Sequence, residues 1–261
     1  MSLIKIILEY LIFIIKAKNK HSVHSPFVFH FITEIINKNY SDENTKRIEN
    51  LKKELCKSKK TINILDFGAG SFINRSKKRK VKDIARKSGK NKKFGRLLYR
   101  IIKFLKPNNI IELGTSLGIS TCYLAKGNSK SKIFSFEGCP ETIKIAKDNL
   151  NEINVDNVKL IEGDFNITLL KELKKIKKID VAFIDGNHQE KPTLKYYNDI
   201  LKYSTNETII IFDDINWSIG MQNAWGEIKK HPKTKVTIDL FFIGIVFIKK
   251  ELSKEHFKIR F

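Results

Sequence analysis

The sequence predicts an α/β fold in which helices cover both faces of a mostly parallel sheet, preceded by a helical region and closed by an antiparallel hairpin. Two observations lead to this fold. From Phe94 onward, short apolar runs alternate with segments whose apolar residues repeat every three or four positions. Near the C-terminus, two apolar runs follow one another closely, which favours a hairpin. Because strands that alternate with helices form parallel sheets, the alternation sets the fold class.

Each element can be placed from its pattern. A helix is predicted at residues 94–105, and Pro107 stops it. Strands are predicted at residues 110–113, 132–136, 158–161, 179–184 and 208–212. Helices are predicted between them, around residues 120–125, 141–151, 169–174 and 192–203. One more helix and the two strands of the hairpin, residues 235–240 and 243–248, complete the chain.

Residues 1–92 differ in sequence pattern from the rest of the chain and are predicted to be a helical accessory region, with residues 93–261 as a separate domain. Ser25 and Pro26 open a helix to about Ile36, since serine caps helices well and proline suits the first helical position. Residues 41–44 open another, which ends near Lys57. A short strand at 62–66 and a glycine turn at 66–71 follow, and then a very basic stretch, residues 75–93.

The first 16 residues are apolar apart from Ser2, Lys5, Glu9 and Lys16. A membrane span needs about 20 apolar residues, so this stretch is too short and too often interrupted by charge. No small-residue cleavage site follows it, so we do not expect a secretory signal. The spacing predicts an amphipathic helix that docks on the protein itself, on a partner or on a membrane surface.

The chain carries a formal net charge of +22, which would attract nucleic acid, acidic lipid or an anionic ligand. Its richness in Lys, Ile and Asn together is also what an AT-rich genome produces, so the charge alone assigns no partner. Cys56, Cys122 and Cys139 lie far apart, which argues against a zinc site or a disulfide framework. We expect a cytoplasmic protein, with the inner membrane surface as an alternative.

The strongest local signal is the turn after the strand at 110–113, which has glycines at Gly114 and Gly118 and leads into a helix. Such a turn lets a ligand approach the backbone, and the open helix end offers N–H groups to it. The next strand ends in Glu137, 25 residues after Glu112. In a Rossmann-like sheet an acid at that position binds ribose hydroxyls, so the two features predict an adenosine site.

The glycine spacing distinguishes between adenosine ligands. Dinucleotide sites carry G-x-G-x-x-G, which clamps a pyrophosphate, whereas this turn reads G-x-x-x-G. A ligand without phosphates, S-adenosylmethionine (SAM), fits better than NAD. Asp164 and Phe165 end the third strand and could hold the adenine amino group and ring. The turn at 66–71 looks similar, but no apolar strand ending in an acid follows it, so we expect a structural turn there.

Five motifs in this order, ELGTSLGIS, FSFEG, LIEGDF, KIDVAFIDGNH and TIIIFDDINW, resemble those of class I SAM-dependent methyltransferases. Within that superfamily they are most similar to the group of catechol O-methyltransferase and other small-molecule O-methyltransferases. The resemblance covers about residues 94–249. It implies SAM as the cofactor, bound by Glu112, Gly114, Thr115, Ser116, Gly118, Glu137, Gly138, Asp164, Phe165 and Asp185.

Acids also end the later strands: Asp185 ends the fourth, and Asp213 and Asp214 end the fifth. Carboxylates that converge repel one another unless they are protonated, paired or bound to a cation, and Mg²⁺ prefers oxygen ligands. The resemblance implies a divalent ion at these three positions, which would lower the pKa of an acceptor hydroxyl. Metal-independent relatives keep acids there too, so the ion stays open.

The resemblance also places a catalytic base at His188, three residues after Asp185, although the relative compared has lysine there. A loop histidine that caps the next helix is the alternative. Trp217, just after the fifth strand, is a candidate to stack on the substrate, whereas Trp225 is expected in the core. His21, His24 and His30 are not expected to bind metal, since no cysteine or acid joins them; a lid or dimer element fits them better.

These features together predict an enzyme that transfers a methyl group from SAM to a hydroxyl of a small molecule or glycan. One alternative is an RNA ribose methyltransferase that uses the basic residues 75–93. Base N-methylation is disfavoured because residues 185–188 read Asp-Gly-Asn-His. The other alternative is a SAM-binding protein without catalysis that acts at a membrane surface through residues 1–16. The acceptor and the oligomeric state are left open.

Overall fold

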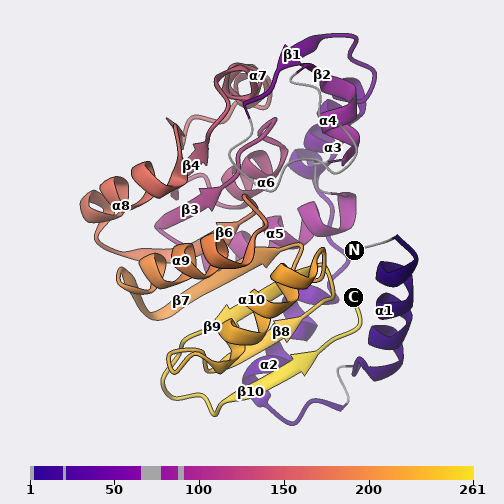
Figure 1. Cartoon of the computed structure of the whole chain (residues 1–261), viewed down its shortest axis with the longest axis vertical. Coiled ribbons are helices and arrows are strands. Elements are labelled where there is room, and N and C mark those ends of the chain that lie inside the picture. The colour runs from indigo at the N-terminus through magenta and orange to yellow at the C-terminus, as the bar shows by residue number, and fades with distance from the viewer. Residues whose placement is uncertain (1–2, 20–21, 66–77, 88–90) are drawn as a thin grey trace. The chain divides into compact units, whose positions relative to one another are not determined.

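The computed structural model describes residues 3–19, 22–65, 78–87 and 91–261 (Figure 1). They form two compact units. The first unit comprises residues 1–38 and 177–261, and the second comprises residues 39–176. The turn predicted at 66–71 and His21 lie outside the described residues. The division into an accessory region, residues 1–92, and a separate domain, residues 93–261, stays a prediction.

The second unit is built on three parallel strands in the order β3-β4-β5, namely β3 (Asn109–Leu113), β4 (Lys132–Glu137) and β5 (Val158–Glu162). The helices that connect or follow them are α6 (Ile119–Gly127), α7 (Pro140–Glu152) and α8 (Phe165–Ile176). Before them come α3 (Glu43–Leu55), β1 (Thr61–Asn63), β2 (Lys78–Lys80), α4 (Val81–Lys87) and α5 (Lys92–Leu105). β1 and β2 pair with each other as a small antiparallel sheet.

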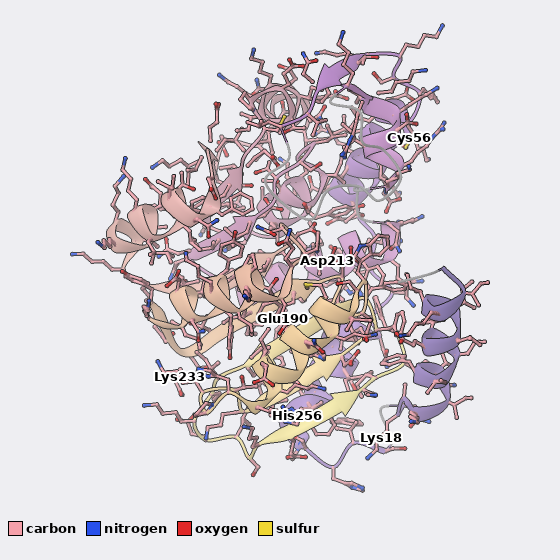
Figure 2. The ribbon with its side chains drawn as sticks, viewed as in Figure 1. Lys18, Cys56, Glu190, Asp213, Lys233 and His256 are labelled. Atoms are coloured by element: carbon pink, nitrogen blue, oxygen red, sulfur yellow. The ribbon has the colours of Figure 1, made fainter. Side chains whose placement is uncertain are left out.

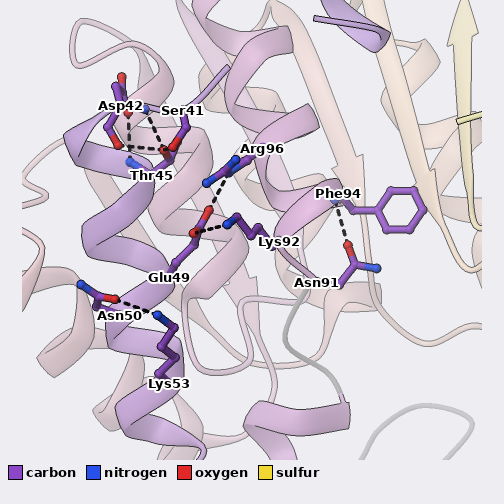
Figure 3. Close-up of polar contacts among 10 residues, drawn as sticks. All are labelled: Ser41, Asp42, Thr45, Glu49, Asn50, Lys53, Asn91, Lys92, Phe94 and Arg96. Carbon is purple, nitrogen blue, oxygen red and sulfur yellow. Dashed lines mark hydrogen bonds and ion pairs between the residues drawn. The ribbon is translucent and has the colours of Figure 1, made fainter. Parts of the chain in front are cut away.

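The helices α3 and α5 are tied together by charge (Figure 3). Asp42 caps α3 in a capping box with Thr45, in which each side chain accepts the other residue's backbone N–H. One turn on, the Glu49 carboxylate lies 2.6 Å from Arg96 Nε and 3.3 Å from Lys92 Nζ. Because Glu49 and Arg96 are largely buried, this pair fixes how the two helices cross.

The first unit is a sheet in the order β10-β8-β9-β7-β6. Its strands are β6 (Ile179–Ile184), β7 (Ser204–Asp213), β8 (Val236–Asp239), β9 (Ile243–Phe247) and β10 (Glu255–Lys258). β6 and β7 are parallel, β9 is antiparallel to both β7 and β8, and β10 is parallel to β8. The helices are α1 (Leu3–Lys16), α2 (Pro26–Phe31), a π-helix (Ile32–Ile36), α9 (Glu190–Leu201) and α10 (Ile219–Lys230).

Aromatic contacts show how this sheet is covered. On one face, Phe212 of β7 packs against Tyr197 of α9 and Trp225 of α10. On the other face, Phe247 of β9 packs edge-on against Phe27 and Phe31 of α2. Figure 1 shows the same layers, with α9 and α10 in front of the strands and α2 behind them. Trp225 is buried, as predicted.

The fold class is confirmed: a mostly parallel α/β fold with helices between the strands and the antiparallel hairpin β8–β9. The five predicted strands are all present within one residue of their bounds, except that β7 begins at Ser204. The strand predicted at 62–66 is the three-residue β1. β10 was missed, because only Phe257 and Ile259 are apolar among exposed charges in this edge segment.

The N-terminal helix docks on its own unit. Phe13 of α1 and the following Ala17 pack against Phe241 in the β8–β9 turn. One face of the helix therefore docks on the protein itself, which is one of the three predicted alternatives. Among the described residues, every helix is too short or too polar to cross a bilayer.

Packing in the first unit leaves no room for a side chain at Gly244. A Cβ added there would lie 2.6 Å from the Trp225 ring. We expect Gly244→Ala to lower the free energy of unfolding by about 1–3 kcal/mol, because the ring or the strand must move. Urea unfolding followed by circular dichroism measures the change.

A second glycine in the same region provides the matched control. A Cβ at Gly226, inside α10, has no neighbour within 4 Å. Since alanine is the better helix former, Gly226→Ala should raise the free energy of unfolding by about 0.5–1 kcal/mol. Equal effects at the two positions would mean that contact with Trp225 is not what excludes a side chain at Gly244.

Candidate active site

The turn between β3 and α6 has the backbone conformation that its glycines predict. Gly114 and Gly118 have φ angles of 102° and 79°, and Ser116 between them has 48°. The backbone N–H groups of Gly114 and Thr115 both donate to the Phe136 carbonyl of β4, at 2.9 and 3.0 Å. The turn is therefore bonded to the end of the neighbouring strand, and a side chain at either glycine would be strained.

Glu137, at the end of β4, lies against this turn. Its Oε2 accepts the Ser116 N–H at 2.7 Å, and its Oε1 accepts the Cys139 N–H at 2.9 Å. Burial raises the pKa of Glu137, while the N–H groups of Cys139, Ser116 and Gly138 act in the opposite direction. The acid predicted to bind ribose is thus within one hydrogen bond of the predicted turn, and its orientation is fixed from both sides.

Glu112 is fully buried beneath the turn. Its Oε2 accepts hydrogen bonds from Thr121 Oγ1 of α6 and Ser135 Oγ of β4, both at 2.6 Å. The Ser135 hydroxyl also lies 2.6 Å from that of Thr115. This chain of hydroxyls joins the strand before the turn, the turn itself and the helix after it, so Glu112 supports the turn from inside. Sequence reasoning missed Thr121 and Ser135.

The remaining predicted residues of this unit lie at the carboxyl end of β5. Asp164 Oδ1 accepts the Asn166 N–H at 2.8 Å, and Phe165 begins α8. Gly163 donates its N–H to the Glu137 carbonyl at 3.0 Å, which brings the ends of β4 and β5 together. Glu137, Gly138, Asp164 and Phe165 are all half-buried. The second unit therefore gathers its predicted cofactor residues at the carboxyl ends of β3, β4 and β5, where α/β sheets bind ligands.

The first unit brings together a second group at the ends of β6 and β7. Asp185, His188 and Asp213 each offer one ligand atom, and these atoms all lie within 4.8 Å of one another. His188 Nε2 is 3.8 Å from Asp185 Oδ1. Asp213 is buried and the other two are half-buried. Asp214, which the sequence grouped with the other acids, is not part of this trio in the described chain.

Asn187 belongs to the same loop and was not predicted. Its Nδ2 donates to the Tyr196 hydroxyl at 3.3 Å, whereas its Oδ1 is buried with no hydrogen-bond partner among the described residues. Asn187 and His188 have φ angles of 71° and 44°, and Asp214 has 55°. Left-handed backbone at such side chains is strained and is common at functional sites.

The loop after β7 is held by the β8–β9 turn. Ile215 donates its N–H to the Phe242 carbonyl at 3.2 Å, and Asn216 Nδ2 donates to the Phe241 carbonyl at 2.7 Å. Trp217 follows with 42% of its surface exposed, on a loop whose neighbouring residues are pinned. His24 and His30 are exposed and belong to no group of three metal-ligating side chains in the described residues.

Residues 111–215 match the family model described as a methyltransferase domain. This part of the chain is therefore similar to a methyltransferase domain. The match confirms the resemblance that the five motifs indicate, and it includes residues from both units.

Individual relatives agree with the domain. A catechol O-methyltransferase of Niastella koreensis is 26% identical over 124 residues, which are 46% of this chain and 55% of that enzyme. The chain thus spans about half the length of this curated relative. Among solved structures, a methyltransferase of Podospora anserina with SAH bound has a TM-score of 0.60 at 17% identity, covering 81% of this chain and 90% of that one. An O-methyltransferase of Bacillus cereus in complex with SAH has a TM-score of 0.53 at 19% identity, covering 85% and 97%. These likenesses extend over more of the chain than residues 111–215, and at this identity they show the fold alone.

Glu137 gives the stability of the second unit a pH dependence of definite sign. Because burial raises its pKa, the native state keeps a proton at pH values where the unfolded chain has released it. The free energy of unfolding therefore contains a contribution that falls as the pH rises through the raised pKa. Glu137→Gln lacks this titration, so we expect its stability to fall less steeply with pH above the usual glutamate range in urea unfolding.

Glu141 on α7 is the matched control. Its carboxylate accepts hydrogen bonds from Asn63, and these lower its pKa. Its stabilising contribution is lost only as the pH falls below the usual glutamate range. Glu141→Gln should therefore leave the slope above about pH 4.5 unchanged. Parallel curves for wild type and Glu137→Gln would contradict the burial argument.

Proposed function

We propose that the protein is a SAM-dependent methyltransferase that transfers a methyl group to a hydroxyl oxygen of a small molecule or glycan. The observation that carries the proposal is the Glu137 carboxylate bonded to the turn at Gly114–Gly118, in a domain of the methyltransferase family. The relatives add support, since the curated one is a catechol O-methyltransferase and two solved ones hold SAH, the product that SAM leaves after methyl transfer.

The cofactor residues divide by chemistry. Glu137 accepts hydrogen bonds from the ribose hydroxyls, with Gly138 beside it. Asp164 and Phe165 receive the adenine amino group and ring face. Backbone groups at the turn, supported by Glu112, bind the methionine part of SAM. Gly114, Thr115, Ser116 and Gly118 form this turn. Asp185 completes the proposed set.

Asp185 and Asp213 fit a divalent ion such as Mg²⁺. Two carboxylates with ligand atoms within 4.8 Å repel each other, a bound cation would relieve this repulsion, and hard cations prefer oxygen ligands. The buried Asn187 Oδ1 adds a neutral oxygen in the same loop. When bound, the ion would polarise the acceptor hydroxyl and lower its pKa. Asp214 stays a predicted third acid.

His188 then acts as the base. An imidazole changes its charge near neutral pH, so it can take the proton of the hydroxyl as the oxygen attacks the methyl group. Nε2 lies 3.8 Å from the Asp185 carboxylate, which favours the imidazolium that forms. Trp217 offers an exposed ring on which a flat acceptor can stack. We therefore expect Trp217→Ala to raise the KM for the acceptor and to leave the affinity for SAM unchanged.

Calorimetric titration of SAM into the purified protein tests the cofactor. We expect micromolar binding to the wild type. In Glu137→Gln the dissociation constant should rise about 10- to 100-fold, because a hydrogen bond to a charged acceptor is lost. Glu152→Gln, an exposed acid at the end of α7, should bind SAM like the wild type. Equal affinities in all three proteins would contradict the proposed ribose contact.

The same titration separates the alternatives. Absence of SAM binding in the wild type would overturn the proposal. RNA binding that weakens steeply with salt would favour the ribose methyltransferase, for which Lys78–Lys80 and Val81–Lys87 supply cations among residues 75–93. SAM binding together with a cellular phenotype that survives both His188→Ala and Asp213→Ala would favour a role without catalysis.

The ion has its own test, which needs no SAM. Mn²⁺ serves as the probe, and its free concentration is followed by electron paramagnetic resonance. We expect Asp185→Asn and Asp213→Asn each to weaken Mn²⁺ binding at least about tenfold, since each removes a charged ligand. Asp214→Asn is the informative neighbour: a loss there would add Asp214 to the ligands, and no change would leave it outside. A wild type that binds no Mn²⁺ would rule out the metal site.

A further inference from the structure

The outward face of α1 is apolar along its whole length. Six side chains are at least half exposed and recur at spacings of three, one, three, one and three residues. They are Ile4, Ile7, Leu8, Leu11, Ile12 and Ile15, with exposed fractions of 72, 50, 54, 53, 50 and 81%. This spacing places them on one side of a helix, and we name them the α1 stripe. Single exposed apolar residues are ordinary, but a contiguous patch of six marks an interaction surface.

The opposite face of α1 is fixed to the first unit, so the stripe cannot turn inward. Tyr10 packs edge-on against Phe241 and in a stacked arrangement against Phe242, at centroid distances of 5.0 and 6.1 Å. Phe13 contacts the same Phe241 ring at 5.4 Å. Arg260 donates from Nη2 to the Ile14 carbonyl at 2.8 Å. These contacts come from the β8–β9 turn and from the chain after β10, and they hold the helix with the stripe facing away.

The charged residues of α1 follow the same division between an outer and an inner side of the helix. Its one acid, Glu9, accepts a hydrogen bond from Gln222 of α10 and so faces the protein. Lys5 and Lys16 are exposed at the two ends of the helix, and Lys18 follows. Apolar residues facing outward, cations at the ends and the acid turned inward form the pattern of a helix that lies on a lipid surface.

Further cations lie where α1 ends. Lys18 pairs with the chain beyond β10: its N–H donates to the Lys258 carbonyl at 2.8 Å, and the Arg260 N–H donates to the Lys18 carbonyl at 3.2 Å. Lys18, Lys258 and Arg260 are all exposed. Figure 2 shows Lys18 just below the end of α1, with His256 on the neighbouring strand β10. A basic rim of Lys16, Lys18, Lys258 and Arg260 therefore borders one end of the stripe.

We propose that α1 binds the surface of an anionic phospholipid bilayer, lying in the interface plane with the α1 stripe among the acyl chains and the basic rim on the headgroups. The charge selects this occupant. Two copies of the chain joined through their stripes would bring two basic rims together, in a protein of net charge +22, whereas anionic lipid neutralises them. At 14 residues α1 is suited to lie on a bilayer. The proposal is independent of methyl transfer.

Vesicle flotation with the full chain tests it, in the absence of SAM. One set of vesicles is phosphatidylcholine alone, and the other contains one quarter phosphatidylglycerol. We expect the wild type to float with the anionic vesicles at low salt and to be released at high salt. The double variant Ile7→Asp/Leu11→Asp should lose at least about tenfold in partition coefficient, because it places two charges in the middle of the stripe.

Ile167→Asp on α8 is the matched control, since Ile167 is 72% exposed and lies in the second unit. It makes the same chemical change away from α1 and should float like the wild type. Because Ile7 and Leu11 are half exposed, the double variant should keep its circular dichroism and melting temperature, and the milder Ile4→Ser/Ile15→Ser should show a smaller loss. Equal flotation of wild type and double variant, or none of the wild type, would overturn the proposal. Dimerisation in sedimentation velocity that the double variant abolishes would overturn it in favour of a second copy.

Discussion

The two hydrogen bonds that Glu137 accepts, from Ser116 and from Cys139, join the features on which the candidate cofactor site depends. The first reaches across from β4 to the turn after β3, and the second fixes the acid to its own loop. The first needs the parallel pairing of β3 with β4, which places Leu113 opposite Phe136 and so brings the two strand ends level. A shift of register would separate the Glu137 carboxylate from the turn.

Strain in the backbone is concentrated in the same places. Eight described residues other than glycine have left-handed φ angles, and four of them lie in the candidate-site loops: Ser116, Asn187, His188 and Asp214. A fifth, Phe241, forms the turn that holds the loop after β7. Such conformations cost free energy and persist only where surrounding bonds enforce them. The Asp239 carboxylate does so at Phe241, whose N–H it accepts at 2.8 Å.

Features with a local sequence signal could be predicted, whereas features that depend on contacts between distant segments could not. The turn at Gly114 and the acid at Glu137 could be predicted, because a glycine requirement and a strand-end acid are local signals at a fixed spacing. The hydroxyls of Thr121 and Ser135 could not, since ordinary threonines and serines become a network only when α6 and β4 come together around Glu112. The strands followed from apolar runs, whereas β10 depends on its pairing with β8 and has no run of its own.

The acid group was predicted only in part for a similar reason. Asp213 is the last residue of β7, whereas Asp214 already belongs to the following loop, where its φ of 55° is left-handed. The trio whose ligand atoms lie together consists of Asp185, His188 and Asp213. Strand-end acids can be identified from sequence, but which of two neighbours joins a cluster is decided by the loop conformation.

The β8–β9 turn contacts two parts of the first unit. On one side, the backbone carbonyls of Phe241 and Phe242 accept hydrogen bonds from the loop after Asp213, which carries Trp217. On the other side, the rings of the same two residues form the seat of α1. Because the turn is strained at Phe241 and held there by Asp239, the loop after β7 and the inner face of α1 depend on the same support.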